Sequence, residues 1–369
     1  MKKLFVLFTM FLFFSCSKES STPEATVSMS VVTQVIPFKS TDGIYNIAYH
    51  IKLSNFQLEG LELIKAEILN NDDQSILRTY ADSTLAANFK AASDPLPTQQ
   101  ELYDGTEKLP NPYLLVWLRV DPSKIPSTIL HRMTFKETSG SLRQITVENI
   151  TSVSNTSPIV IASPVKGEYW YVQGTTTDDP AHFAGIAFLK GHTTCDGLFA
   201  VDMLLFNSAG QYFANTGMQN EDHFCYGQDL YAVADGIVVT ARDIYQDTPV
   251  GQLEHPNMLY EHYCGNEVVI DIGNGNFADY THLKPGSVNV KVGDVVKKGD
   301  IVAKIGNSGA SSGPHLHFEI CCSNPPWHTY GVPYVIDKFV LYYSQSTGVT
   351  NLTFTNTLYE NRSVLHFIF

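Results

Sequence analysis

Alternating hydrophobic and polar positions predict β-strands in the first half of the chain. In residues 45–53 every second side chain is large and apolar, and the side chains between are polar or small. A period of two places alternate side chains on one face, which indicates a half-buried strand. Residues 113–120 are more uniformly apolar and follow Pro110 and Pro112. Such a dense run, preceded by turn residues, is typical of a core strand.

Further strand signals predict a β-sandwich-like domain over residues 27–161. Apolar positions at 133–135 and 145–147 flank Ser139 and Gly140, which is a hairpin signal. One weak helical pattern covers residues 75–89. Several short strands over about 130 residues are typical of a sandwich. Histidines, cysteines and carboxylates do not cluster in this half, so it carries no signal for function.

The second half continues the strand patterns and adds glycine and histidine. Strands are predicted at residues 231–240, 268–272, 277–283, 295–305 and 315–320. The segment Gly273-Asn274-Gly275-Asn276 between two of them predicts a tight hairpin loop. With no long amphipathic helix, the pattern predicts an all-β chain.

The first residues have the pattern of an export signal. Lys2 and Lys3 precede an apolar run over residues 4–14, followed by Ser15 and Cys16. This run suits a secretory signal and is too short for a membrane-spanning helix. The cysteine after a small residue resembles a bacterial lipobox, which implies a signal peptide at 1–15, a lipidated Cys16 and a tether at 16–26. The alternative is an ordinary secreted protein with an incidental cysteine. We expect an exported lipoprotein of the bacterial cell envelope that contacts the membrane through its lipid anchor only.

Charge and cysteine content narrow the possible partners and cross-links. The 24 basic and 37 acidic residues give a net charge of −13 at pH 7, which repels phosphate backbones and excludes a general nucleic-acid binder. Export permits disulfides. Apart from Cys16, five cysteines remain, so at most two bridges form within the chain and several pairings stay open: Cys195, Cys225, Cys264, Cys321 and Cys322.

The strongest chemical signal is a pair of histidines in the segment Gly313-Pro314-His315-Leu316-His317. Residues two apart on a strand share a face, so His315 and His317 project side by side and are candidate metal ligands. His282 ends another predicted strand, and Asp202 lies in an apolar strand after Phe199-Ala200-Val201. A carboxylate there is costly to bury unless it is paired or binds a cation.

These motifs occur in an order that resembles a known enzyme family. The blocks FAVD, AVADGIVV, GNEVVIDIG, the segment from YTHL to VGDVV, GNSG and PHLHF occupy residues 199–202, 232–239, 265–273, 280–295, 306–309 and 314–318. They resemble the LytM-type, lysostaphin-like metallopeptidases of peptidase family M23. Residues 331–335, GVPYV, resemble its long-loop branch. The resemblance implies an antiparallel β-sheet catalytic domain, which we place at 162–345, followed by a β-rich tail at 346–369.

The resemblance also implies residue roles. Asp202 and His317 match two of the family's three zinc ligands, and His282 and His315 match its two other active-site imidazoles. Those two would transfer protons or stabilise an oxyanion. Tyr280, two residues before His282, is either an extra donor on the same face or a packed aromatic.

The first zinc ligand has two candidates. In the long-loop branch a tryptophan precedes the ligand by about a dozen residues, and a glycine precedes the aspartate block. By that pattern Trp170 leads to His182, with Gly191 as the glycine. His192, ten residues before Asp202, is the competitor.

The expected protein is therefore a zinc metalloendopeptidase with one Zn²⁺ ion. It would hydrolyse peptide bonds of peptidoglycan stems or cross-bridges with a metal-activated water. One alternative is a catalytically inactive LytM-like regulator or wall-binding lipoprotein. Another is a 2-His-1-carboxylate iron enzyme, because that class uses the same ligand set.

Overall fold

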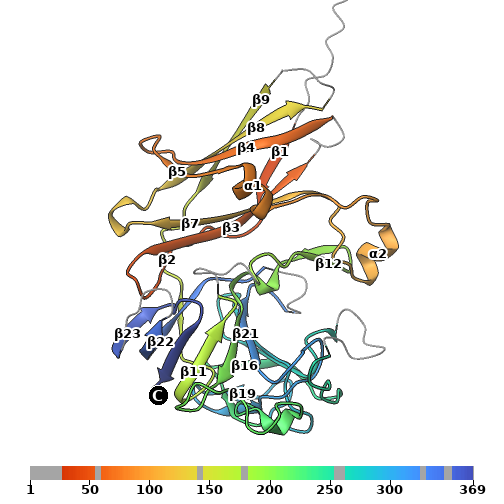
Figure 1. Cartoon of the computed structure of the whole chain (residues 1–369), viewed down its shortest axis with the longest axis vertical. Coiled ribbons are helices and arrows are strands. Elements are labelled where there is room, and N and C mark those ends of the chain that lie inside the picture. Colours follow the sequence, from red (N-terminus) through yellow and green to blue (C-terminus); the bar gives the residue numbers. More distant parts are fainter. Residues whose placement is uncertain are drawn as a thin grey trace, which may run out of the picture.

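The computed structural model describes residues 27–54, 60–138, 144–175, 182–252, 262–324, 330–344 and 351–368. They form two β-rich domains stacked along the long axis of the molecule (Figure 1). The predicted all-β fold is confirmed. The predicted signal peptide, Cys16 and the whole tether lie outside the described residues, as does the Ser139-Gly140 loop.

The N-terminal domain is a sandwich of two sheets. One sheet has the order β1 (Ser28–Val31), β3 (Tyr45–Ser54), β7 (Tyr113–Val120), β6 (Phe89–Lys90), with β2 (Phe38–Lys39) also on β3. The other has the order β5 (Ile76–Ala81), β4 (Leu61–Asn70), β8 (Thr128–Glu137), β9 (Gln144–Ser152). Ile47, Tyr49 and Ile51 of β3 lie in the core of the sandwich. The alternate residues Ala48 and His50 therefore project from the opposite face of this sheet.

The short helices of this domain differ from the predicted pattern. Within residues 75–89 the chain first forms β5, paired with β4, and then α1 (Asp82–Asn88). The first half of the predicted helical segment therefore forms a strand, because it pairs with β4. A second helix, α2 (Gln99–Asp104), begins after a capping box in which the Glu101 amide donates to Thr98 Oγ1 and the Thr98 amide donates to the Glu101 carboxylate.

A large sheet organises the second half. Its strand order is β10, β22, β24, β11, β14, β21, β18, β17, β16, β19, with β23 also on β22. In that order the bounds are Ile159–Ile161, Tyr334–Ser344, Ser363–Phe367, Gly167–Gln173, Val201–Leu205, Leu316–Cys321, Phe277–Thr281, Glu267–Asp271, Gly236–Arg242 and Val295–Val296, and β23 is Leu352–Thr357. Two small sheets accompany it: β12 (Ala187–Leu189) with β13 (His192–Thr194), and β15 (Asp229–Tyr231) with β20 (Ile301–Lys304). β10 pairs with β22 in parallel, and the other strand pairings recorded for the described part of this sheet are antiparallel.

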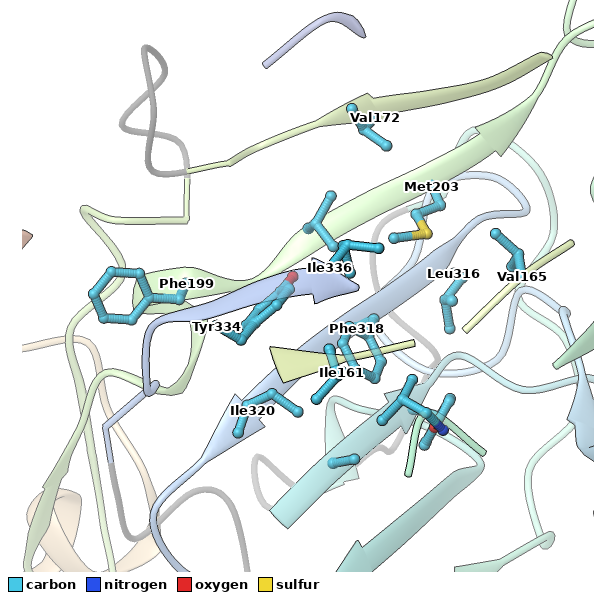
Figure 2. Close-up of a cluster of buried hydrophobic side chains, with 14 of the residues drawn as sticks. Ile161, Val165, Val172, Phe199, Met203, Leu316, Phe318, Ile320, Tyr334 and Ile336 are labelled. Atoms are coloured by element: carbon cyan, nitrogen blue, oxygen red, sulfur yellow. The ribbon is translucent and has the colours of Figure 1, made fainter. Parts of the chain in front are cut away.

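One face of this sheet forms the core, and the other carries the polar residues of interest. Val172, Met203, Leu316 and Phe318 pack together in the hydrophobic cluster of Figure 2. Asp202 and His317 alternate with these residues and pair directly across β14 and β21. Alternation therefore places both side chains on the opposite face.

The C-terminal segment is an integral part of this sheet. β24 lies between β22 and β11, where it pairs with both. Residues of the predicted β-rich tail thus contribute β23 and β24 to this sheet, and β24 connects β22 to β11.

The two domains share an extensive contact around the segment 182–199. Ala48, Tyr113 and Leu115 of the sandwich belong to the same buried cluster as Phe183 and Phe188. Figure 1 shows β12 and α2 lying between the two domains. In the described part of the chain, no helix is long and apolar enough to cross a membrane, and none of the five described cysteines forms a disulfide.

Candidate metal centre

Three side chains from different segments converge on the polar face of the large sheet. Asp202 of β14 lies with Oδ2 3.4 Å from His182 Nε2 and with Oδ1 3.1 Å from His317 Nδ1. His317 comes from β21, and His182 precedes β12. These three residues form one of the groups whose potential ligand atoms all lie within 4.8 Å of one another.

The main chain fixes the orientation of His182. Its Nδ1 lies 3.1 Å from the Gly174 carbonyl oxygen, which can only accept, so Nδ1 carries a proton and Nε2 faces Asp202. Gly174 has φ +75°, and its amide donates to Asn361 Oδ1 at 2.9 Å. A Cβ at Gly174 would lie 2.4 Å from His182 Nδ1. Glycine is therefore required where the backbone meets the ring.

This arrangement fits a divalent cation. Because Nδ1 of neutral His182 is a donor, its Nε2 carries a lone pair that points at Asp202 Oδ2. Two such acceptors at this distance need a proton or a metal ion between them. Burial lowers the pKa of His182, but the Asp202 carboxylate outweighs burial and raises this pKa to about 9, so a proton fills that need in the absence of metal. Ligands on a tetrahedral zinc ion, about 2.0–2.1 Å from the metal, lie about 3.3 Å apart. The separations of 3.4 and 3.1 Å, one to each oxygen of Asp202, are close to this value.

Two further imidazoles border the three residues. His315 donates from Nδ1 to the Gly313 carbonyl at 2.8 Å, and its Nε2 lies 3.5 Å from Asp202 Oδ1. His282 donates from Nδ1 to the Ser308 carbonyl at 2.8 Å, and its ring centroid lies 4.9 Å from that of His315. Burial, with the neighbouring His315 and His317, holds the pKa of His282 well below its usual value. His282, His315 and His317 form a second group with closely spaced potential ligand atoms.

The backbone at His282 explains why Tyr280 does not share its face. β18 ends at Thr281, and His282 has φ +59°, so the period of two does not continue through it. Tyr280 lies in the core, where its hydroxyl donates to the Tyr231 carbonyl at 3.0 Å and accepts from the Val233 amide at 2.9 Å. The structure thus supports the packed-aromatic interpretation of Tyr280.

The other histidines considered in the sequence lie apart from this arrangement. His192 is exposed on β13 and belongs to none of the ligand groups found among the described residues. His223 is buried with Nε2 3.2 Å from the Gly217 carbonyl oxygen. His262 packs its ring against Tyr245, and His255 lies outside the described residues. The structure thus brings His182, and not His192, next to Asp202 and His317.

A cavity on each side of the three residues completes the site. The first, here the aromatic cavity, has a volume of about 860 Å³ and is lined by Asp202 and His315 together with Tyr171, Phe206 and Tyr212. The second, here the interdomain cavity, has a volume of about 520 Å³. Its lining includes His182, His317 and Glu319 from the large sheet domain, and Lys90, Glu107 and Leu109 from the sandwich. No sequence pattern predicts these three sandwich residues, because their contact with the cavity depends on how the domains pack.

Comparison with known proteins identifies relatives of the second half. Residues 221–327 match the sequence profile described as peptidase family M23. The peptidoglycan DD-endopeptidase ShyA of Vibrio cholerae is 35% identical over 100 residues, which are 27% of this chain and 19% of that protein. The glycyl-glycine endopeptidase ALE-1 of Staphylococcus capitis is 38% identical over 88 residues, 24% of each chain.

Among solved structures, the catalytic domain of lysostaphin from Staphylococcus simulans is similar. It is 24% identical, and the match covers 37% of this chain and 77% of that one with a TM-score of 0.24. The matched region spans about a fifth to a quarter of the length of the two curated relatives.

Proposed function

We propose that this protein, which carries a peptidase family M23 domain, is a zinc-dependent endopeptidase that hydrolyses peptide bonds of bacterial peptidoglycan. The observation that carries the proposal is the convergence of His182 and His317 on Asp202 at 3.4 and 3.1 Å. Two imidazoles and one carboxylate are a donor set of catalytic zinc sites, which keep a further position for solvent or substrate.

The metal and the surrounding residues would have separate roles in peptide-bond hydrolysis. His182, Asp202 and His317 would hold a zinc ion. When bound, it would supply a Lewis acid for polarising the scissile carbonyl and for acidifying an attacking water molecule. His182 is oriented by its hydrogen bond to Gly174, in the way that the partners of metal ligands usually fix the ligand ring.

We assign proton transfer and oxyanion stabilisation to His282 and His315. Each ring donates from Nδ1 to a backbone carbonyl, which fixes the tautomer and leaves Nε2 to act on substrate. His282 is neutral at pH 7 because burial holds its pKa low, so its Nε2 is available to accept a proton. His315 lines the aromatic cavity and His282 lines the interdomain cavity, which supports roles on opposite sides of the scissile bond.

The relatives and the cleft support the choice of substrate. ShyA and ALE-1 are named as peptidoglycan and glycyl-glycine endopeptidases, respectively. Cavities on both sides of the metal ligands suit an extended peptide that continues past the cleaved bond in both directions. Export and lipidation at Cys16, as the sequence predicts, would place the enzyme in the envelope where this polymer lies.

Digestion of purified peptidoglycan, with mass spectrometry of the released fragments, tests the proposal. The zinc-loaded protein should release peptides that map to one bond type, and His317→Ala should release none. His192→Ala is the control and should digest at the wild-type rate. Equal digestion by wild type and His317→Ala would contradict the assignment, and no digestion by zinc-loaded wild type would favour a regulator.

A further inference from the structure

A buried histidine of the N-terminal sandwich contacts the segment that carries His182. His50 of β3 is fully buried and projects from the face of its sheet that meets the second domain. Its Nε2 lies 2.8 Å from the carbonyl oxygen of Phe183, the residue after His182. Its ring also packs against the Phe183 ring, with 5.0 Å between centroids.

The second ring nitrogen of His50 completes a clamp on the same segment. Nδ1 lies 3.0 Å from Cys195 Sγ, and that sulfur lies 2.9 Å from the Gly185 carbonyl oxygen. Burial lowers the pKa of His50 to about 4, so the ring is neutral at pH 7. The Phe183 carbonyl can only accept, so Nε2 carries the ring proton. The single proton of the Cys195 thiol lies between two acceptors, the Gly185 carbonyl and His50 Nδ1. One imidazole thus joins both ends of the loop 183–195.

The loop transmits this restraint to His182. The Gly185 amide donates to the His182 carbonyl at 2.9 Å, so a tight turn links the clamped residues to the ligand. The sandwich also holds the rest of the loop: Thr106 and Phe188 exchange two backbone hydrogen bonds of 2.8 Å, and the Gly191 amide donates to the Leu102 carbonyl at 2.8 Å. Figure 1 shows this contact at β12 and α2.

We infer that His50 is a positioning residue of the metal centre, through which the N-terminal domain sets the place of the ligand His182. This inference rests on the proposed role of His182 as a metal ligand. It gives the sandwich a defined part in the site: without His50, the turn at 182–185 keeps its internal hydrogen bond but loses its attachment to a rigid sheet. Residues that hydrogen-bond to metal ligands contribute about 10- to 100-fold to metal affinity. His50 bonds to Phe183, the residue after the ligand, so we expect an effect at the lower end of this range.

Zinc affinity of the full-length protein, measured by chelator competition, tests the inference without any substrate. We expect His50→Phe, which keeps the ring volume and removes both hydrogen bonds, to weaken zinc binding about tenfold. His50→Gln, whose amide reaches the Phe183 carbonyl, should recover most of this loss. The matched control is His131→Phe, because His131 is equally buried in the sandwich and bonds Tyr49 at 2.9 Å. It should keep wild-type affinity.

Hydrogen exchange of the metal-free protein gives an independent readout. The Gly185 amide should exchange faster in His50→Phe than in wild type, and at the wild-type rate in His131→Phe. Wild-type zinc affinity and exchange in His50→Phe would overturn the inference, as would equal losses in His50→Phe and His131→Phe. His182→Ala separates the two proposals: if it leaves zinc affinity unchanged, the metal-site assignment fails, and this inference fails with it. Should His50→Phe not fold, Cys195→Ala tests the same clamp, and its unchanged affinity would overturn it.

Discussion

At the residue scale, one backbone position decides how the proposed metal ligand His182 is oriented. The Gly174 carbonyl accepts a hydrogen bond from His182 Nδ1, and the missing side chain of Gly174 leaves room for the ring, since a Cβ there would lie 2.4 Å from Nδ1. Gly191, which the family pattern highlights, has a similar φ of +79° but no atom within 4 Å of the added Cβ. A substitution at Gly191 therefore tests the cost of a left-handed backbone alone, whereas a substitution at Gly174 also displaces the ring of His182.

We predict that Gly174→Ala weakens zinc binding by at least tenfold and lowers peptidoglycan digestion in proportion, because the ring must move away from Asp202. Gly191→Ala is the control: a non-glycine residue in the left-handed region costs about 1–2 kcal/mol of stability. It should leave zinc affinity unchanged. Chelator competition and thermal unfolding of both variants measure the two effects. Equal zinc affinities in the two variants would contradict this role of Gly174.

The residues of the site were predictable where a short motif carries them. Asp202, His282, His315 and His317 each lie in a block with a strong local pattern, and the structure brings all four together with His182. Spacing from Trp170 favoured His182 over His192, but the contacts that hold His182 in place, with Gly174 and with the sandwich, were not predictable from spacing. The contact between His50 and Cys195, for example, joins residues 145 positions apart.

At the element scale, two buried histidines make the sandwich sensitive to acid. Burial lowers the pKa of His50 on β3 and of His131 on β8 to about 4, below the value of 6.5 in an unfolded chain. The unfolded state therefore binds more protons between these values. The contribution of these two histidines to the free energy of unfolding is fully present above about pH 6.5 and decreases as the pH falls toward 4.

We predict that the free energy of unfolding falls by up to about 3 kcal/mol per histidine between pH 6.5 and pH 4. Denaturant unfolding at pH 7 and pH 5 measures it. In His131→Phe the difference in unfolding free energy between pH 7 and pH 5 should be smaller by the contribution of one histidine. The other titratable residues contribute equally in both proteins. An unchanged pH dependence in this variant would show that His131 is not buried in neutral form.

Strands were predictable where one periodicity governed the whole element. β3 and β7 follow the alternating and the dense apolar patterns of their sequences. The pattern failed where a local backbone feature intervened. At His282 a positive φ ends the alternation, so Tyr280 enters the core although it lies two residues away. The capping box of α2 is visible in the sequence at Thr98 and Glu101, but the helix is too short for a periodic signal.

At the scale of the whole molecule, the N-terminal domain forms part of the cleft wall. Lys90, Glu107 and Leu109 line the interdomain cavity opposite His182 and His317. Domain packing creates this wall, so no pattern within either half predicts it. The sandwich thereby contributes to the substrate path as well as to the position of His182.

We predict that Lys90→Ala raises KM for a peptide substrate about two- to fivefold and leaves zinc affinity unchanged. The reason is that a half-exposed ammonium attracts substrate carboxylates with about 0.2–1 kcal/mol. Lys136→Ala removes an exposed ammonium from β8 and should leave KM at the wild-type value. Steady-state kinetics on a soluble stem peptide compares the two. An unchanged KM in Lys90→Ala would exclude contact between Lys90 and the substrate.

The proposed metal site holds one zinc ion between His182, Asp202 and His317. The decisive measurement is anomalous diffraction from zinc-loaded crystals, recorded on both sides of the zinc and iron absorption edges. We expect one strong zinc peak within bonding distance of these three side chains. A peak bound by His282, His315 and His317 instead, a peak at the buried group Asp279, Glu319 and Cys321, or an iron signal would contradict the claim.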